Sequence, residues 1–167
     1  MEYDALIKNG TWRLVDPPAS FKPIGCKWVY KIKYKENSSL DKYKARIVEE
    51  GYTQREGVDY TETFAPTAKW GTIRTLFSLE AHNSWKIYHM DVKTTFLNGN
   101  LKEYVYMFHP EGFVVKGKEK KVRKLVKVLY GSKQASRAWY EKLTKHLLKL
   151  NYILFDLDDA TLFVKNL

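Results

Sequence analysis

The sequence predicts an α+β fold, in which a mostly antiparallel sheet packs against helices. Three observations predict it: strand and helix patterns interleave without a regular β-α-β rhythm, hairpin signals dominate among the strands, and 167 residues suit one domain. Hydrophobic residues make up 44% of the chain and aromatic residues 15%. That is enough to form a core, so disorder is excluded as the main description.

The first expected elements are a short helix and a hairpin. Residues 2–8 suit the helix, because a helix-stopping Asn-Gly pair follows them. From residue 27 to 35, aromatic or aliphatic residues alternate with lysines. This period of two predicts a half-buried strand with a basic outer face. Residues 36–39 are an expected turn, and residues 43–48 are the expected return strand.

The middle of the chain is less regular. Residues 51–69 are typical of a loop with short extended pieces. A helix is expected from residue 72 to about 82, because apolar residues recur there at helical spacing. Residues 85–92 are a strand candidate, and residues 105–107 are a candidate to pair back with it after an Asn-Gly turn.

The last third of the chain predicts a strand, a helix and an extended tail. Residues 122–130 are expected to form a basic strand. A helix is expected over residues 137–150 with Ser136 as its cap, because its leucines and a tryptophan share one face. Residues 152–164 are expected to be extended.

Positive charge is concentrated in two segments. The chain has a net charge of +10. Residues 115–150 contain twelve basic and two acidic residues, and residues 22–46 contain eight basic and two acidic ones. The two segments are interpreted as two walls of an anion-binding surface. Ordinary solvated lysine faces are the alternative.

Several classes of protein are excluded by composition. The single cysteine, Cys26, excludes a disulfide within the chain and a four-cysteine zinc site. No apolar run approaches the ~20 residues that cross a bilayer, so no membrane partner is expected. The sequence begins without an apolar signal region, and we expect an intracellular protein, either cytoplasmic or nuclear.

One carboxylate is a candidate metal ligand. Asp91 lies at the end of the expected strand 85–92 and near the Asn-Gly turn, where its oxygens could bind a divalent cation. Magnesium normally needs a second carboxylate and phosphate oxygens as well. A surface or helix-capping role for Asp91 therefore remains open.

Blocks of residues in a fixed order along the chain match one family. They are Asn9-Gly10-Thr11-Trp12, Pro23-Ile24-Gly25-Cys26-Lys27-Trp28-Val29-Tyr30-Lys31, Tyr43-Lys44-Ala45-Arg46, Gly51-Tyr52-Thr53-Gln54, Glu62-Thr63-Phe64-Ala65-Pro66, Met90-Asp91-Val92-Lys93-Thr94, Pro110-Glu111-Gly112-Phe113, Leu129-Tyr130-Gly131, Lys133-Gln134-Ala135 and Trp139-Tyr140. On these blocks the sequence resembles the reverse transcriptase domain of copia-type LTR retrotransposons, over residues 3–165.

The resemblance implies a fold and an activity. Residues 1–167 would form a single reverse transcriptase domain, truncated before its end, with a fingers-like part at about 20–85 and a partial palm at about 86–167. The family adds deoxynucleoside triphosphates (dNTPs) to a primer on an RNA or DNA template, and it uses Mg²⁺. The implied partners are therefore an RNA/DNA primer–template and dNTPs.

The resemblance also implies roles for individual residues. Asp91 corresponds to the first metal-binding, catalytic aspartate of the palm, and Phe96 to the ring that excludes a 2′-hydroxyl from the sugar site. Arg46 corresponds to the fingers residue that meets the triphosphate, with Lys44 as its basic neighbour. Gln134 lies in the nucleotide-positioning block. The expected nucleic-acid-binding set consists of basic residues near this block: Lys120, Lys121, Arg123, Lys124, Lys127, Lys133 and Arg137.

The chain departs from the family pattern at a few positions. Glu49-Glu50 stands where the family usually has Ala-Lys, Thr95 where it has Ala, Ser132 where it has Leu and Ser136 where it has Pro. These changes are interpreted as drift.

The larger departure concerns the second metal-binding element, a Tyr-x-Asp-Asp hairpin. In the family this hairpin follows a segment that corresponds to residues 159–164 of this chain. The sequence ends at Leu167. Asp158-Asp159 lies upstream of the expected position and is interpreted as part of a turn.

We therefore expect a polymerase fragment that is not competent by itself. The alternative is a domesticated, non-catalytic remnant that binds nucleic acid or another protein. Palm surface left exposed could also drive self-association.

Overall fold

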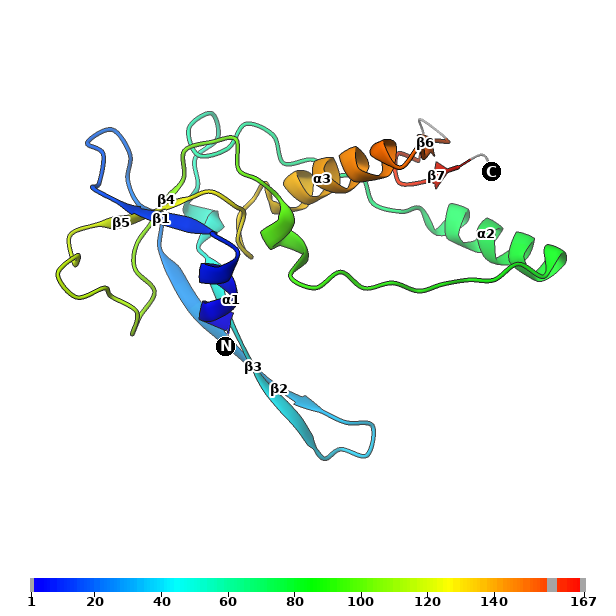
Figure 1. Ribbon diagram of the computed structural model, residues 1–167, viewed down its shortest axis with the longest axis horizontal. Helices are drawn as coiled ribbons and strands as arrows, with labels where there is room; N and C mark the ends of the chain where they lie inside the picture. The colour runs from blue at the N-terminus through cyan, green and yellow to red at the C-terminus, as the bar shows by residue number, and fades with distance from the viewer. Residues whose placement is uncertain (1, 156–158, 166–167) are drawn as a thin grey trace.

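The computed structural model describes residues 2–155 and 159–165. Within that part the chain is a mixed α/β structure with three antiparallel sheets and three α-helices (Figure 1). The expected combination of helices with antiparallel strands is confirmed at this level.

A small sheet and a short helix form the centre of the molecule. Strands β1 (Trp12–Val15), β4 (Tyr106–Met107) and β5 (Val122–Leu125) pair in the order β1-β5-β4. Helix α1 (Glu2–Lys8) forms over the predicted residues and lies beside these strands (Figure 1). The core gathers aliphatic side chains from far apart in the sequence: Leu6, Ile47, Leu97, Val105, Met107, Leu125 and Leu129. This long-range packing fixes the elements that carry the candidate site.

A long hairpin leaves this core. Strands β2 (Cys26–Tyr34) and β3 (Leu40–Glu49) pair antiparallel, so the predicted hairpin is confirmed, although β3 begins three residues earlier than expected. At its base Ile47 is fully buried, but the outer half extends away from the body as a two-stranded ribbon (Figure 1). The prediction of a half-buried aromatic face is wrong for that half, because Tyr30 and Tyr43 are 74% and 75% exposed.

The region around Asp91 differs from the prediction. Helix α2 (Trp70–Asn83) forms two residues earlier than expected, yet it buries no residue. The predicted strand at 85–92 is wrong: these residues are irregular and exposed. An alternating pattern makes a strand only where a partner strand pairs with it, and the candidate partner β4 pairs with β5 instead. The chain then returns to the core at the short 3₁₀ helix η2 (Thr95–Asn98).

The last elements follow the prediction more closely. Helix α3 (Ala135–Lys149) contacts η2, while β6 (Ile153–Leu154) and β7 (Phe163–Val164) form a short hairpin in the extended tail. Strand β5 ends at Leu125, five residues before the predicted end. The predicted cap at Ser136 is wrong: the helix begins at Ala135, and Gln134 is the N-cap residue. Asp158 lies outside the described residues.

None of the helices in the part of the chain described by the structure is both long and apolar enough to cross a bilayer.

Candidate functional site

The ring of Tyr130 contacts two residues that the family resemblance assigns to a nucleotide. Arg46 on β3 places its guanidinium carbon 4.5 Å from the centroid of the Tyr130 ring. Phe96 of η2 meets the same ring edge-on, with the ring centroids 5.1 Å apart. The structure therefore assembles Arg46 and Phe96, which are fifty positions apart, around one aromatic side chain.

Backbone contacts fix the position of Tyr130. Its carbonyl accepts a hydrogen bond of 2.7 Å from the amide of Glu49, and Tyr130 also forms a parallel bridge with Val48. The next residue, Gly131, has φ of +94°, and a Cβ atom there would clash with the carbonyl of Glu49. Glycine is thus required for the turn to approach β3 this closely. Sequence reasoning did not assign Tyr130 a role, although it lies in the Leu-Tyr-Gly block.

Basic side chains lie close together on the face of the hairpin that carries Arg46. Lys44 lies two residues before Arg46 on the same face, and it pairs across the strands with Lys31. Partial burial, and then the nearby charges of Arg46 and Lys33, lower the pKa of Lys44. A bound anion would relieve this repulsion. The arrangement of Lys44 and Arg46 is therefore suited to phosphate oxygens.

The side chain of Gln134, near this region, forms its hydrogen bonds within the protein. Its side-chain oxygen accepts a hydrogen bond of 3.1 Å from the amide of Gln54, and its own amide donates to the carbonyl of Asp59 at 3.2 Å. The residue is buried at the start of α3. Gln134 thus ties the segment after the hairpin to α3, and its amide is not presented to a ligand here.

Two of the departures from the family pattern meet in space. Glu49 is only 2% exposed, and its carboxylate accepts a hydrogen bond from the hydroxyl of Ser132. The other carboxylate oxygen of Glu49 has no hydrogen-bond partner within the described part of the chain. Burial raises the pKa of Glu49 to about 7. The contact shows that these two departures form one buried polar pair, next to the segment that carries Tyr130.

Asp91 is not part of this assembly. It lies exposed in the irregular segment 84–94, not at the end of a strand as predicted. Among residues 2–155 and 159–165, no three His, Cys, Asp or Glu side chains group in a way that could hold a metal ion. Magnesium requires more oxygen ligands than one carboxylate supplies. The described residues therefore do not by themselves fit the Mg²⁺ ion that the resemblance implies.

The expected nucleic-acid-binding set divides into exposed and internally bonded residues. Lys120 lies exposed in the turn before β5, while Lys121 forms a 3.2 Å ion pair with Asp16. Lys124 places its ammonium 4.2 Å from the Tyr104 ring centroid. Lys127 is half-buried. The exposed lysines of this set can bind a phosphate directly. The other residues would first have to break or share the contact that they make within the chain.

Arg123 corrects the expectation for this set. It is 1% exposed, and its guanidinium donates hydrogen bonds to the hydroxyl of Tyr3 at 3.0 Å and to the carbonyl of Phe113 at 2.8 Å. The guanidinium also lies 4.5 Å from the ring centroid of Trp12. Arg123 is therefore a core residue, because these acceptors and rings replace water around its charge.

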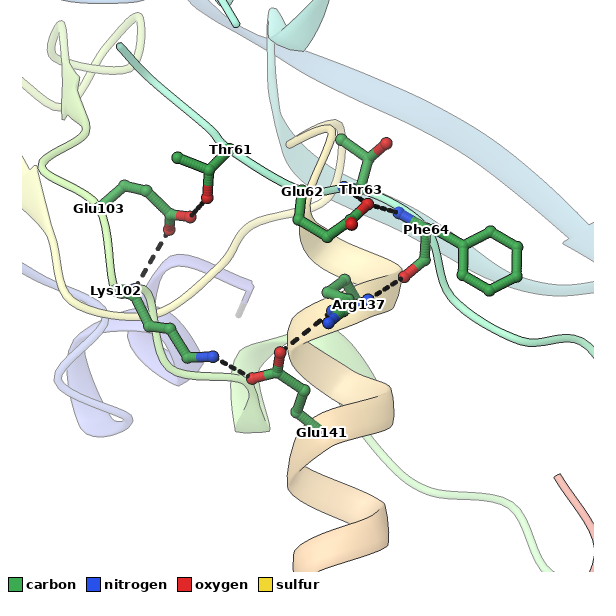
Figure 2. A network of polar contacts seen from close by, with 8 residues as sticks. All are labelled: Thr61, Glu62, Thr63, Phe64, Lys102, Glu103, Arg137 and Glu141. Carbon is green, nitrogen blue, oxygen red and sulfur yellow. Dashed lines mark hydrogen bonds and ion pairs between the residues drawn. The ribbon is translucent and has the colours of Figure 1, made fainter. Parts of the chain in front are cut away.

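Arg137 and Lys133 are partly engaged as well. Figure 2 shows Arg137 between the carboxylate of Glu141, at 3.1 Å, and the carbonyl of Phe64, at 3.2 Å. Lys102 reaches the same carboxylate at 2.6 Å and, with Arg137, lowers the pKa of Glu141. Lys133 is exposed, and its ammonium donates to the hydroxyl of Tyr60 at 3.2 Å.

The chain is similar to proteins of known family. A family profile described as "Reverse transcriptase (RNA-dependent DNA polymerase)" matches residues 9–166. The retrovirus-related Pol polyprotein from transposon RE1 of Arabidopsis thaliana is 46% identical over 164 residues, which cover 98% of this chain and 11% of that protein. The polyprotein from transposon TNT 1-94 of Nicotiana tabacum is 45% identical over 91% of this chain and 11% of its own length.

A more distant relative comes from yeast. The truncated transposon Ty1-A Gag-Pol polyprotein of Saccharomyces cerevisiae is 30% identical over 149 residues, which cover 89% of this chain and 12% of that protein. The chain thus spans about a tenth of the length of these relatives. No solved structure matches it.

Proposed function

The chain belongs to the reverse transcriptase (RNA-dependent DNA polymerase) family, in the form found in copia-type Pol polyproteins, and from this premise we propose that its 167 residues bind primer–template and a deoxynucleoside triphosphate. We propose further that these residues do not catalyse nucleotide addition by themselves. The observation that carries the proposal is the contact of Arg46 and Phe96 with the single ring of Tyr130.

The contacts suggest what each residue would do. The guanidinium of Arg46 would bind phosphate oxygens of the nucleotide, supported by the neighbouring ammonium of Lys44. Phe96 would lie against the sugar, where a bulky ring leaves no room for a 2′-hydroxyl. Tyr130 would keep these two side chains at a fixed separation. We assign the hairpin β2–β3 and its base to the fingers, and η2 with α3 to the palm.

Catalysis requires more than this binding site. Among the described residues, the exposed carboxylate of Asp91 belongs to no group of three or more His, Cys, Asp or Glu side chains that could hold a metal ion. Binding and positioning of the nucleotide are therefore the functions that these residues support. A non-catalytic nucleic-acid-binding module is the second candidate, and the exposure of Asp91 in an irregular segment is the observation that favours it.

Salt-dependent binding tests the proposal. A fluorescently labelled RNA/DNA primer–template is titrated with the chain at several salt concentrations, and log affinity is plotted against log salt. Each lysine that contacts a phosphate contributes a slope of about −0.9 on a duplex. The exposed residues Lys120 and Lys133 are changed to glutamine together. The matched control is Lys86→Gln, in the exposed segment that carries Asp91.

We expect salt-dependent binding by the wild type. The slope should become shallower by about 1 to 2 in the Lys120/Lys133 double variant and stay unchanged in Lys86→Gln. Undetectable or salt-insensitive binding of the wild type would contradict the proposal, as would an equal loss in the control.

A further inference from the structure

A buried acid, Glu49, lies close to the contacts of the proposed nucleotide site. It is the last residue of β3, three positions after Arg46, and it is 2% exposed. One of its carboxylate oxygens accepts a hydrogen bond from the hydroxyl of Ser132. Within the described part of the chain the other oxygen has no hydrogen-bond partner. The charge state of this acid therefore matters for the contact between β3 and the segment of Ser132.

Ser132 closes the turn that carries Tyr130. The amide of Ser132 donates a hydrogen bond to the carbonyl of Leu129 at 3.4 Å, and the amide of Leu129 donates to the hydroxyl of Ser132 at 3.4 Å. Both distances are long for such bonds, so the turn is closed only weakly by its own groups. Tyr130 and Gly131 are its two central residues. The hydroxyl that closes this turn is also the one that bonds to Glu49.

The turn packs tightly against the end of β3. The carbonyl of Tyr130 accepts a hydrogen bond of 2.7 Å from the amide of Glu49. A Cβ atom at Gly131 would clash with the carbonyl of Glu49, and a Cβ atom at Gly51 would clash with the carbonyl of Gly131. Tightly packed segments change between discrete arrangements rather than by small continuous shifts. We therefore consider two arrangements, in which the turn either lies against β3 or is separated from it.

The surroundings of Glu49 disfavour its negative charge. Burial raises the pKa of Glu49 to about 7, against the effect of the hydrogen bond from Ser132 and together with the negative charge of Asp59. Across the strands Glu49 faces Cys26, whose thiol stays neutral because burial raises its pKa to about 11. The adjacent residue, Glu50, is acidic as well. None of these three neighbours supplies a positive charge.

The cations on neighbouring segments are bonded to other groups. Arg55 forms an ion pair of 3.6 Å with Asp59, and the ammonium of Lys133 donates to the hydroxyl of Tyr60 at 3.2 Å. The guanidinium of Arg46 lies on the ring at the tip of the turn. An ionised carboxylate that is buried without a countercharge is costly. The buried acid is therefore suited to its neutral form while the turn lies against β3.

Loss of the proton changes what Glu49 requires. The neutral carboxyl needs only the hydrogen bond with Ser132 and buries no charge. Once the proton has passed to solvent, both carboxylate oxygens need water or further donors. Water can reach them when the turn moves away from β3. The amide of Lys133 remains bonded to the side chain of Gln54 at 2.8 Å, which would confine the movement to the turn.

We propose that Glu49 and Ser132 are positioning residues that make the proposed nucleotide site respond to pH. With a neutral carboxyl, the turn holds the ring of Tyr130 against Arg46 and Phe96. With an ionised carboxylate, the turn separates from β3 and the ring leaves both side chains. This regulation rests on the proposed function, because its ligand is the deoxynucleoside triphosphate that Arg46 and Phe96 would bind.

Three variants separate the charge from the packing. Glu49→Gln keeps the size and an acceptor for Ser132 but cannot ionise. Glu49→Ala with Ser132→Leu restores the two residues that the family pattern usually has, and this apolar pair can hold the turn without a titrating group. Glu36→Gln is the matched control, since it removes an exposed carboxylate at the turn of the hairpin.

Nucleotide affinity as a function of pH tests the response. A fluorescently labelled deoxynucleoside triphosphate is titrated with each chain between pH 6 and pH 8. Because phosphate groups themselves titrate at about pH 6, each affinity is divided by that of Glu49→Gln at the same pH. Hydrogen exchange of the amide of residue 49, measured by NMR and corrected for its intrinsic rate, reports separately on the turn. This amide bonds to the carbonyl of Tyr130 and loses protection when the turn leaves β3.

We expect the relative affinity of the wild type to fall about 2- to 30-fold from pH 6 to pH 8, the range expected for loss of a cation–π contact. Glu36→Gln should show the same fall. The variant with Glu49→Ala and Ser132→Leu should keep a constant ratio to Glu49→Gln. Protection of the amide of residue 49 should decrease with pH in the wild type and stay constant in Glu49→Gln.

Other outcomes would overturn the inference, each in a distinguishable way. If the wild type and Glu49→Gln bind with the same pH profile, the pair does not act on the nucleotide, while the proposed function stands. If no chain binds the nucleotide at any pH, both fail. A fall of the same size in the variant with Glu49→Ala and Ser132→Leu would assign the response to another group. Constant protection of the wild-type amide would show that the turn does not separate from β3.

Discussion

The surroundings of Tyr130 and those of Asp91 are built in different ways, although the family resemblance associates both with one nucleotide. Around Tyr130, β3, η2 and the turn before α3 meet through contacts between half-buried side chains and a backbone hydrogen bond. Around Asp91, the segment 84–94 is exposed and follows a helix that buries no residue. The difference teaches that this sequence encodes, through its own packing, the relative positions of the two side chains that the resemblance assigns to a nucleotide, Arg46 and Phe96. It does not do so for its candidate metal ligand.

The largest expected effect compares the stability of the two regions. Leu97→Ala, next to Phe96 at a fully buried position, should lower the free energy of unfolding by about 2–5 kcal/mol, because it leaves a cavity in the core. Met90→Ala, next to Asp91, should change it by less than about 0.5 kcal/mol, because Met90 is 84% exposed. Urea denaturation followed by circular dichroism measures both. If the two substitutions lowered the free energy of unfolding by similar amounts, the segment around Asp91 would be packed after all.

The next effect concerns the buried pair of Glu49 and Ser132. Since the pKa of Glu49 is raised from 4.5 to about 7 in the folded state, the folded chain binds more protons than the unfolded chain between these two values. The free energy of unfolding should therefore fall as pH rises through this window. Titration of Glu49 accounts for a decrease of about 3 kcal/mol in the free energy of unfolding across this window.

Glu49→Gln tests the origin of that fall. The variant keeps the size and an acceptor for Ser132 but cannot titrate, so its stability should lose this pH dependence. Chemical denaturation at pH 5, 6, 7 and 8 measures the effect. An unchanged pH profile in the variant would show that Glu49 is not the group responsible.

A smaller effect tests the role assigned to the ring of Tyr130. Tyr130→Leu removes the face on which Arg46 lies and the edge that Phe96 meets. It should weaken the affinity for a deoxynucleoside triphosphate roughly 2- to 30-fold, the usual range for a cation–π contact. Tyr130→Phe keeps the ring and should bind like the wild type. Titration with a fluorescent nucleotide measures both variants, and equal weakening by Phe and Leu would exclude a role for the ring itself.

Regular local patterns made part of the fold predictable. The alternation along residues 27–35 predicted β2, and the apolar spacing in α3 predicted that helix to within a few residues. The strand predicted at 85–92 failed because alternation alone does not provide a pairing partner. Arg46 and Phe96 were assigned by resemblance. Their shared contact with Tyr130 could not be predicted, because it depends on how β3 packs against a distant turn.

Charged residues were harder to place from sequence. A basic run does not distinguish a surface lysine from an arginine whose charge is surrounded by carbonyl oxygens and rings, and Arg123 is of the second kind. Likewise, Glu49 and Ser132 are 83 positions apart, so only the folded chain shows that they form one pair.

Primer extension tests most directly whether these residues bind without catalysing. The 167-residue chain is incubated with a primer–template, all four deoxynucleoside triphosphates and Mg²⁺, with Asp91→Asn in parallel. We predict that neither chain extends the primer, although both bind it equally in the salt titration of the labelled primer–template. Robust extension by the wild type that Asp91→Asn abolishes would show that Asp91 belongs to a working metal site, and would contradict the distinction drawn between the two regions.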